Sequence, residues 1–438
     1  MSFVRKTVFV SASQLFVICL TTLAGILFAR ALGPAGIGRY DLLRSTAQVG
    51  GVLLALGIGN AAVYFLNHHR ISTTHLASTA FKTGVLLAAT LFVVLAVGMA
   101  AFPRYFGSAP TWVVLLFAGG AGCQLITDLL YPVLVAQLAA RRMVSVQLTK
   151  SSVLLLVGGA LVLLHKLSVN GALLVLALSF FVTSMLVVMY LSPEIDLRTP
   201  FDWRLAGRLT RYGLTLSASN LLYLLALNVA LFLLRKLEPD QFDQLGLYSR
   251  ATALCGLIIL FPQTIAPLLY SKWSQTPNQV KARQVELVAR LSTSLGLAAA
   301  IVVALCGKYI LWLLYGHAFA AAAGTLRILV VAVVCMAMFN VFVQLLASDG
   351  RARATNWILA TSVVVTSLLT ILLVPHFGIE GAALAVLCGN AIAALLAMRL
   401  SAKLYGIRPS RCVLLQPQDI ALGWTALASR GPKTVNAA

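Results

Sequence analysis

The stretch at residues 171–191, GALLVLALSFFVTSMLVVMYL, contains no charged side chain. A helix that crosses a bilayer needs about 20 mostly apolar residues, so this stretch predicts a membrane span. The whole chain has the same character, because 60% of its 438 residues are hydrophobic and 10% are charged. Soluble domains carry about 25% charged residues. So few charges exclude a string of soluble domains and predict an all-α integral membrane protein.

Apolar runs of this kind recur along most of the chain, and we predict twelve transmembrane helices. Their expected positions are residues 8–29, 45–66, 83–101, 112–136, 151–164, 171–191, 212–234, 246–271, 291–307, 328–347, 355–374 and 381–398. The first run follows Arg5 and Lys6 and resembles a signal peptide. It is too long for one and eleven more spans follow, so we expect a retained helix.

The basic residues are distributed unequally between the two sides that these spans define. With the N-terminus inside, 23 of the 33 lysines and arginines fall on the cytoplasmic side, including Lys150 just before the fifth span. Cytoplasmic loops are enriched in Lys and Arg, so we predict that both termini are cytoplasmic. This topology explains most of the net charge of +21 without a nucleic-acid partner.

Short motifs recur in the same order in the two halves of the chain. Residues 11–15 resemble 217–221, residues 38–40 (Gly-Arg-Tyr) resemble 246–248 (Gly-Leu-Tyr), and residues 171–173 resemble 381–383. Each half holds six predicted spans, so the repeat is parallel. Transporters built from such repeats bind substrate between them, which predicts a central cavity.

The repeat divides the chain into two six-helix lobes. We predict an N-lobe at residues 1–191, a cytoplasmic linker at 192–211, a C-lobe at 212–406 and a cytoplasmic tail at 407–438.

Arg44 and Arg250 lie near the starts of corresponding spans in the two halves. A guanidinium in lipid is costly and usually faces a cavity or a partner. An arginine from each lobe, pointing into the cavity, would bind a phosphate or pyrophosphate in a fork. The alternatives are snorkelling to the interface and, for Arg44, pairing with Asp41 one helical turn earlier.

Other polar residues in or beside apolar runs are further candidates for the cavity, although packing or snorkelling would also explain each of them. They are Arg30, Arg327, Asn220, Asn228, Asn340 and Gln344. Asp128 lies inside an apolar stretch and shares a helical stripe with Gln124. With Asp41 it is a candidate for coupling to an H⁺ or Na⁺ gradient, and a partner on another helix is its alternative. We expect no metal site, no other cofactor and no enzymatic activity, because the corresponding motifs are lacking.

Several segments resemble the polysaccharide-biosynthesis flippases of the Wzx type, in the superfamily that includes the MATE exporters and the lipid II flippase MurJ. These segments are Arg30-x-Leu32-Gly33-Pro34-x-Gly36-x-Gly38-x-Tyr40, Leu56-Gly57-Ile58-Gly59-Asn60, Ile310-Leu311-Trp312-Leu313-Leu314-Tyr315-Gly316, Asp349-Gly350-Arg351-x-Arg353-x-x-Asn356 and Pro375-x-Phe377-Gly378-Ile379-x-Gly381-Ala382-Ala383-Leu384. The ordered set covers nearly the whole chain up to about residue 406.

This resemblance implies a flippase in the bacterial inner membrane that turns an undecaprenyl-pyrophosphate-linked oligosaccharide by alternating access, for O-antigen or exopolysaccharide export. Its implied partners are that lipid-linked substrate, membrane lipids, and possible polymerase and glycosyltransferase enzymes. It also places Arg44 and Arg250 in the cavity wall.

Three other functions remain open. A MATE-like, cation-coupled multidrug exporter would need an acidic cavity, for which only Asp128 and Asp41 are available. A membrane enzyme would need a sizeable periplasmic loop. A non-transporting scaffold has no distinguishing sequence feature.

Overall fold

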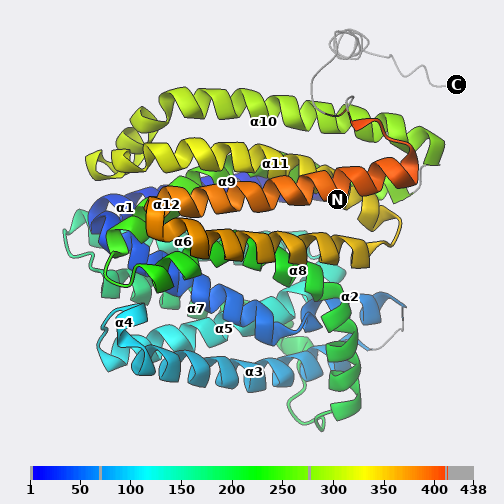
Figure 1. Ribbon diagram of the computed structural model, residues 1–438. Coiled ribbons are helices and arrows are strands. Elements are labelled where there is room, and N and C mark those ends of the chain that lie inside the picture. Colours follow the sequence, from blue (N-terminus) through cyan, green and yellow to red (C-terminus); the bar gives the residue numbers. More distant parts are fainter. Residues whose placement is uncertain (1–2, 69–71, 275–277, 410–411, 413–438) are drawn as a thin grey trace, which may run out of the picture. The chain divides into compact units, whose positions relative to one another are not determined.

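The computed structural model describes residues 3–68, 72–274, 278–409 and 412, and within them every regular element is helical (Figure 1). The α-helices are α1 (Phe3–Ala55), α2 (Ile58–His68), α3 (Thr73–Ala101), α4 (Pro103–Phe106), α5 (Thr111–Ala136), α6 (Ala140–Leu163), α7 (Val169–Leu191), α8 (Trp203–Leu237), α9 (Phe242–Ser274), α10 (Asn278–Tyr315), α11 (Ala323–Ser348) and α12 (Ala352–Tyr405). Two 3₁₀ helices are η1 (Ser192–Glu194) and η2 (His317–Ala322). The all-α membrane prediction is therefore confirmed at the level of fold class.

Within the described residues, nine helical stretches are long and apolar enough to cross a membrane. The predicted number of twelve is not tested by this count, because long helices contain more than one predicted span. α12 contains the last two, and α1 contains the first and the beginning of the second. α9, which contains the eighth, is not among the nine stretches.

Glycines break the two longest helices. Gly33 in α1 has φ of 67° and Gly378 in α12 has φ of 54°, a backbone conformation that side chains with a Cβ disfavour. Pro34 follows the first break, where it can begin a new helical segment without losing a needed N–H donor. α1 therefore consists of a first arm up to Gly33 and a second arm from Pro34 onward.

Two predicted spans begin later than the helices that contain them. The second span was expected from residue 45, but the second arm of α1 begins at Pro34. The fifth was expected from residue 151, but α6 begins at Ala140. Arg44 and Lys150 therefore lie inside helices and not at helix ends, and the side of the membrane on which Lys150 lies stays a prediction.

The chain divides into two compact units. The first comprises Met1–Ala251, Lys308–Thr325 and Thr366–Ala385, and the second comprises Thr252–Gly307, Leu326–Val365 and Val386–Ala438. In the first unit α5 packs against α2, α3 and α7, while α1 packs against α6 and α8. The lobes predicted from the internal repeat stay a prediction, and residues 410–411 and 413–438 of the predicted tail lie outside the described residues.

The segment that precedes α8 is anchored by an N-cap. Asp202 accepts a hydrogen bond from the Leu205 N–H at 2.9 Å, and its carboxylate lies 3.8 Å from His75 in the first turn of α3. The hydrogen bond from Leu205, with that from Arg204 and the charges of His75 and Arg208, outweighs desolvation and lowers the pKa of Asp202. The cap lies inside the segment predicted as a linker at 192–211, whose last residues, from Trp203 onward, belong to α8.

Candidate functional site

The first unit encloses a cavity of about 650 Å³, lined by both arms of α1 together with α5, α6 and α7 and by residues of α2, α8 and α9. Most of its polar side chains come from α1, α5 and α6. The polar residues of the lining are Thr21, Tyr40, Arg44, Gln48, Asn60, Gln124, Asp128, Gln147, Lys150, Ser151, Ser217, Asn220 and Arg250. Four of the predicted candidates, Arg44, Arg250, Asn220 and Asp128, therefore line one cavity.

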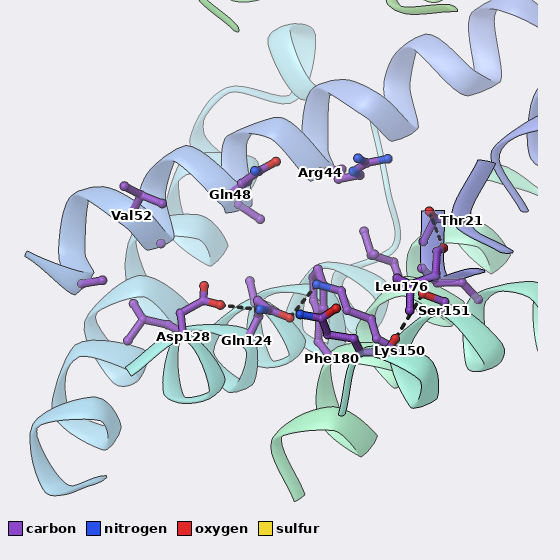
Figure 2. A pocket seen from close by; sticks show the side chains of 18 of the residues that line it. Thr21, Arg44, Gln48, Val52, Gln124, Asp128, Lys150, Ser151, Leu176 and Phe180 are labelled. Carbon is purple, nitrogen blue, oxygen red and sulfur yellow. Dashed lines mark hydrogen bonds between the residues drawn. The ribbon is translucent and has the colours of Figure 1, made fainter. Parts of the chain in front are cut away.

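Arg44 lies on the second arm of α1 and is exposed to the cavity. Figure 2 shows its side chain beside that of Gln48, one turn further along the same helix, above the side chains of α5 and α6. Within the part of the chain that the structure describes, Arg44 has no hydrogen bond and no ion pair. Its guanidinium donors are therefore available to a ligand.

Arg250 lies on α9 and is buried, and its Nη2 donates to Oδ2 of Asp41 on α1. Ser249 Oγ donates to the same Asp41 oxygen at 2.7 Å. Gly25 leaves room for the guanidinium, because a Cβ there would lie 3.4 Å from Arg250 Nη1. The pairing considered for Asp41 was with Arg44, whereas the structure pairs Asp41 with Arg250.

This pairing separates the two predicted phosphate ligands. The Arg250 guanidinium is largely neutralised, although its buried Nε has no hydrogen-bond partner among the described residues. A buried ion pair of this kind is expensive to break, because one charge is left uncompensated. Of the two side chains, Arg44 is the more accessible to an anion, and Arg250 forms a contact between α1 and α9.

Lys150 is the charged cavity residue that the sequence analysis missed. It lies ten residues into α6, about 15 Å along the helix axis. Its Nζ donates to Gln124 Oε1 at 3.0 Å and lies 4.8 Å from the centroid of the Phe180 ring. The missed signal is a helical stripe, since Gln147, Lys150, Ser151 and Leu154 are spaced i, i+3, i+4, i+7 and all line the cavity.

Asp128 is open to the cavity, and its Oδ1 accepts a hydrogen bond from Gln124 Nε2 at 2.7 Å. The predicted stripe of Gln124 and Asp128 on one helix face therefore has a direct counterpart in the structure. Gln124 connects the carboxylate to Lys150 on the next helix, as the dashed lines in Figure 2 show.

Three of the remaining candidates donate hydrogen bonds to backbone carbonyls within their own units. Asn228 donates to the Leu224 carbonyl of its own helix at 2.9 Å. Arg30 donates to the carbonyls of Leu313 and Leu314 at the end of α10, next to a shallow hollow. In the second unit Arg327 donates to the Ala304 carbonyl at 3.2 Å.

Two amide candidates also belong to the second unit. Asn340 carries a buried Nδ2 with no hydrogen-bond partner among the described residues, and Gln344 is half-buried one turn later. A contact of either residue with the substrate stays a prediction.

Two further arginines hold a short segment between α3 and α5. Arg39 donates to the carbonyls of Phe106 and Ser108, and buried Arg235 donates to those of Arg104 and Tyr105. Burial raises the pKa of Tyr105 in α4 to about 12, against the lowering effect of Arg235. These arginines, which lie on the predicted outer side, therefore bind backbone carbonyls.

A sequence model described as polysaccharide biosynthesis protein matches residues 3–270. No curated protein matches the chain with significance.

Solved structures share the fold of this chain at low sequence identity. The lipid II flippase MurJ in an inward closed conformation has a TM-score of 0.73 and 11% identity, over 98% of this chain and 94% of that one.

Two transporters of the MOP superfamily are also similar. A multidrug resistance MATE family transporter in an inward-facing conformation has a TM-score of 0.70 and 17% identity, over 88% of this chain and 95% of that one. A transporter from Pyrococcus furiosus is described as having a binding pocket of reverse polarity. It has a TM-score of 0.63 and 16% identity, over 91% of this chain and 94% of that one.

Proposed function

Because this chain belongs to the polysaccharide biosynthesis protein family, we propose that it is a flippase for an undecaprenyl-pyrophosphate-linked oligosaccharide. The substrate would pass from the cytoplasmic to the periplasmic leaflet of the bacterial inner membrane. No covalent bond of the substrate changes in this process, so the protein acts as a transporter.

The observation that carries this proposal is the guanidinium of Arg44, which has no partner among the described residues and lies in a polar cavity within a helical membrane fold. A pyrophosphate group is an anion that a guanidinium binds through parallel hydrogen bonds. The amides around it, Gln48, Asn60, Gln124, Gln147 and Asn220, offer both donors and acceptors, which suit the hydroxyl groups of sugars. The polyprenyl chain would stay in the lipid.

The contact between α1 and α9 suggests how one side of the cavity is closed. A Cβ on Gly38 would lie 2.4 Å from the Phe242 carbonyl oxygen, and one on Gly246 would lie 1.9 Å from that of Pro34. The Asp41–Arg250 pair adjoins this close approach. With both termini cytoplasmic, Gly33 and this contact would lie toward the periplasm, so the cavity would be open to the cytoplasmic side. Alternating access would then require the α1–α9 contact to separate, which would free Arg250 for the pyrophosphate.

A MATE-like multidrug exporter is the second candidate, favoured by the fold and by Asp128 in the cavity. The cations Arg44 and Lys150 in the same cavity oppose the entry of a cationic drug. Drug resistance conferred by the wild-type gene would favour this alternative.

A gene deletion tests the proposed function in cells. Loss of the flippase should abolish surface polysaccharide and trap lipid-linked repeat units on the cytoplasmic face, where a membrane-impermeant glycosidase cannot reach them in intact spheroplasts. Normal surface polymer in the deletion strain, with no other flippase gene present, would contradict the proposal.

A further inference from the structure

A cluster of hydrogen bonds around Asp349 joins the helix ends at one end of the second unit. Asp349, in the turn between α11 and α12, accepts from Lys281 Nζ of α10 and from the Tyr405 hydroxyl at the end of α12, each at 2.5 Å. Glu286 Oε1 of α10 accepts from the backbone N–H of Arg408 at 2.9 Å. The start of α10, the end of α11 and both ends of α12 therefore meet here (Figure 1).

Both acidic side chains of this end are used inside the cluster. Segments 278–290, 348–353 and 399–409 contain Asp349 and Glu286 as their only acids, against eight lysines and arginines. Desolvation is outweighed by the hydrogen bonds from Lys281 and Tyr405, which lower the pKa of Asp349. This carboxylate is therefore ionised and offsets the charge of Lys281, and most of the positive charge at this end has no acid to offset it.

Six of the eight cations are exposed, and we call them the basic rim. They are Arg283, Arg351, Arg353, Arg399, Lys403 and Arg408. Among the described residues, none of the six forms an ion pair with a carboxylate. Like charges gathered at one end of a unit repel one another, and bound anions relieve that repulsion.

The basic rim lies where apolar helical stretches have their ends. Three of the stretches that are long and apolar enough to cross a membrane begin or end at the Asp349 cluster, namely Lys281–Tyr315, His317–Ser348 and Ala352–Tyr405. Charged side chains are costly in hydrocarbon, so such a boundary is expected at the level of the lipid head groups.

Exposed apolar side chains continue directly into the rim on both parts of α12. Trp357 is 77% exposed and lies one helical turn after Arg353 on the same face. Leu395 is 48% exposed, and Arg399 and Lys403 follow it at successive turns. Tryptophan and basic side chains in this order are typical of a membrane interface. These three cations would therefore lie beside the head groups of the surrounding lipid.

We propose that the basic rim binds the head groups of anionic phospholipids, with Arg353, Arg399 and Lys403 in contact with the lipid phosphates. Guanidinium groups bind phosphate oxygens through parallel hydrogen bonds. In the predicted topology this end faces the cytoplasm, and the cytoplasmic leaflet attracts basic segments next to membrane helices through its anionic lipids.

The bound phospholipid is a stabilising neighbour of the second unit and not the transported substrate. A lipid that binds the folded protein stabilises it by mass action. Because Arg353 lies near the start of α12 and Lys403 near its end, phosphates held by both would keep these helix ends together. A lipid is favoured over a soluble anion because the rim adjoins the exposed apolar face of α12.

Thermal unfolding and native mass spectrometry of the full-length protein in detergent test the proposal. The probes are phosphatidylglycerol and phosphatidylcholine with identical acyl chains, inorganic phosphate and poly-glutamate. We expect phosphatidylglycerol to raise the Tm of the wild type and to bind about tenfold or more tighter than phosphatidylcholine. This preference should shrink at high ionic strength, because salt screens exposed charges. Inorganic phosphate and poly-glutamate should leave the Tm unchanged.

A triple variant identifies the residues that hold the lipid. Arg353→Gln/Arg399→Gln/Lys403→Gln should lose the preference for phosphatidylglycerol and the Tm increase that this lipid causes. All three side chains are exposed, so the variant should fold as the wild type does, which circular dichroism checks. Arg353→Lys/Arg399→Lys keeps the charges and should retain most of the preference.

A matched control removes the same number of positive charges from exposed positions of the first unit. It combines Gln substitutions at Arg104, Lys166 and Lys308. This control should keep the lipid preference of the wild type. An equal loss in the control and in the rim variant would assign the effect to net charge and overturn the proposal.

Two results with the wild type alone would also overturn the proposal, so misfolding of a variant cannot conceal its failure. The first is equal affinity for phosphatidylglycerol and phosphatidylcholine. The second is a rise in Tm with inorganic phosphate or poly-glutamate as large as that with phosphatidylglycerol, which would assign the rim to a soluble anion or to an acidic protein segment.

Discussion

Asp41 and Arg250 form a buried ion pair between α1 and α9, and Ser249 donates a hydrogen bond to the same carboxylate. Ser249 is the residue that matches Asp41 when Gly38 is aligned with Gly246 in the internal repeat. Repeat-related positions therefore touch each other at this contact. The internal repeat itself stays a prediction.

Removal of one member of this pair should destabilise the protein strongly. Arg250→Gln and Asp41→Asn should each lower the free energy of unfolding by about 3–5 kcal/mol, because the other charge or its donors are left buried without compensation. The double variant should lose less than the sum of the single losses. Thermal unfolding in detergent measures this, with Arg204→Gln, an exposed residue of α8, as the control. Additive losses would show that the two residues do not interact.

The close approach of α1 and α9 gives a second prediction. Gly246→Ala places a Cβ against the Pro34 carbonyl, so the helices must separate, at a cost of about 1–3 kcal/mol. Gly256→Ala on the same helix has nothing within 4 Å of its Cβ and should leave stability unchanged or slightly raised. The melting temperatures of the two variants test this prediction, and Gly246→Ala should melt at the lower temperature. Equal melting temperatures would contradict the close packing of the two helices.

Hydropathy patterns predicted the class of this fold, but they misplaced the helix starts that matter most for the cavity. The second and fifth spans were expected to begin at residues 45 and 151, whereas their helices begin at Pro34 and Ala140. Charged residues lower the hydropathy of these first turns. A helix that lines a polar cavity is less apolar than one surrounded by lipid, so a hydropathy window excludes the residues that face the cavity.

The partners of the charged residues could not be derived from spacing along the chain. Asp41 is one turn from Arg44, which suggests a local pair, but its partner is Arg250, more than two hundred residues away. The stripe of Gln124 and Asp128 was predicted from the helical period. Its connection to Lys150 depends on the packing of α6 beside α5. The spacing of residues along one helix gives no information about which helix packs against it.

The N-cap of α8 predicts a dependence of stability on acid pH. The pKa of Asp202 is lowered in the folded protein, so its carboxylate stabilises the fold fully above the ordinary value of about 3.9. This contribution is lost as the pH falls through the lower folded pKa. Asp202→Ala should therefore melt at a lower temperature than the wild type at pH values above about 4, and the difference should shrink in more acidic solution. A difference that is constant with pH would contradict the role of the ionised cap.

Arg44 is the residue on which transport should depend most directly, because its guanidinium is exposed to the cavity and has no partner within the described part of the chain. Arg44→Gln keeps a polar side chain but removes the charge. It should fold as the wild type does and lose surface-polysaccharide export when it replaces the wild-type gene. Export at the wild-type level, with equal protein in the membrane, would exclude Arg44 from the binding site.

The measurement that tests the central claim most directly is transport in proteoliposomes. The purified protein is reconstituted with a fluorescent polyprenyl-pyrophosphate-linked oligosaccharide, and its exposure on the outer surface is followed with a membrane-impermeant quencher. The account predicts translocation by the wild type and by Arg204→Gln, and none above protein-free liposomes by Arg44→Gln. Wild-type liposomes that translocate the lipid no faster than protein-free ones would contradict it.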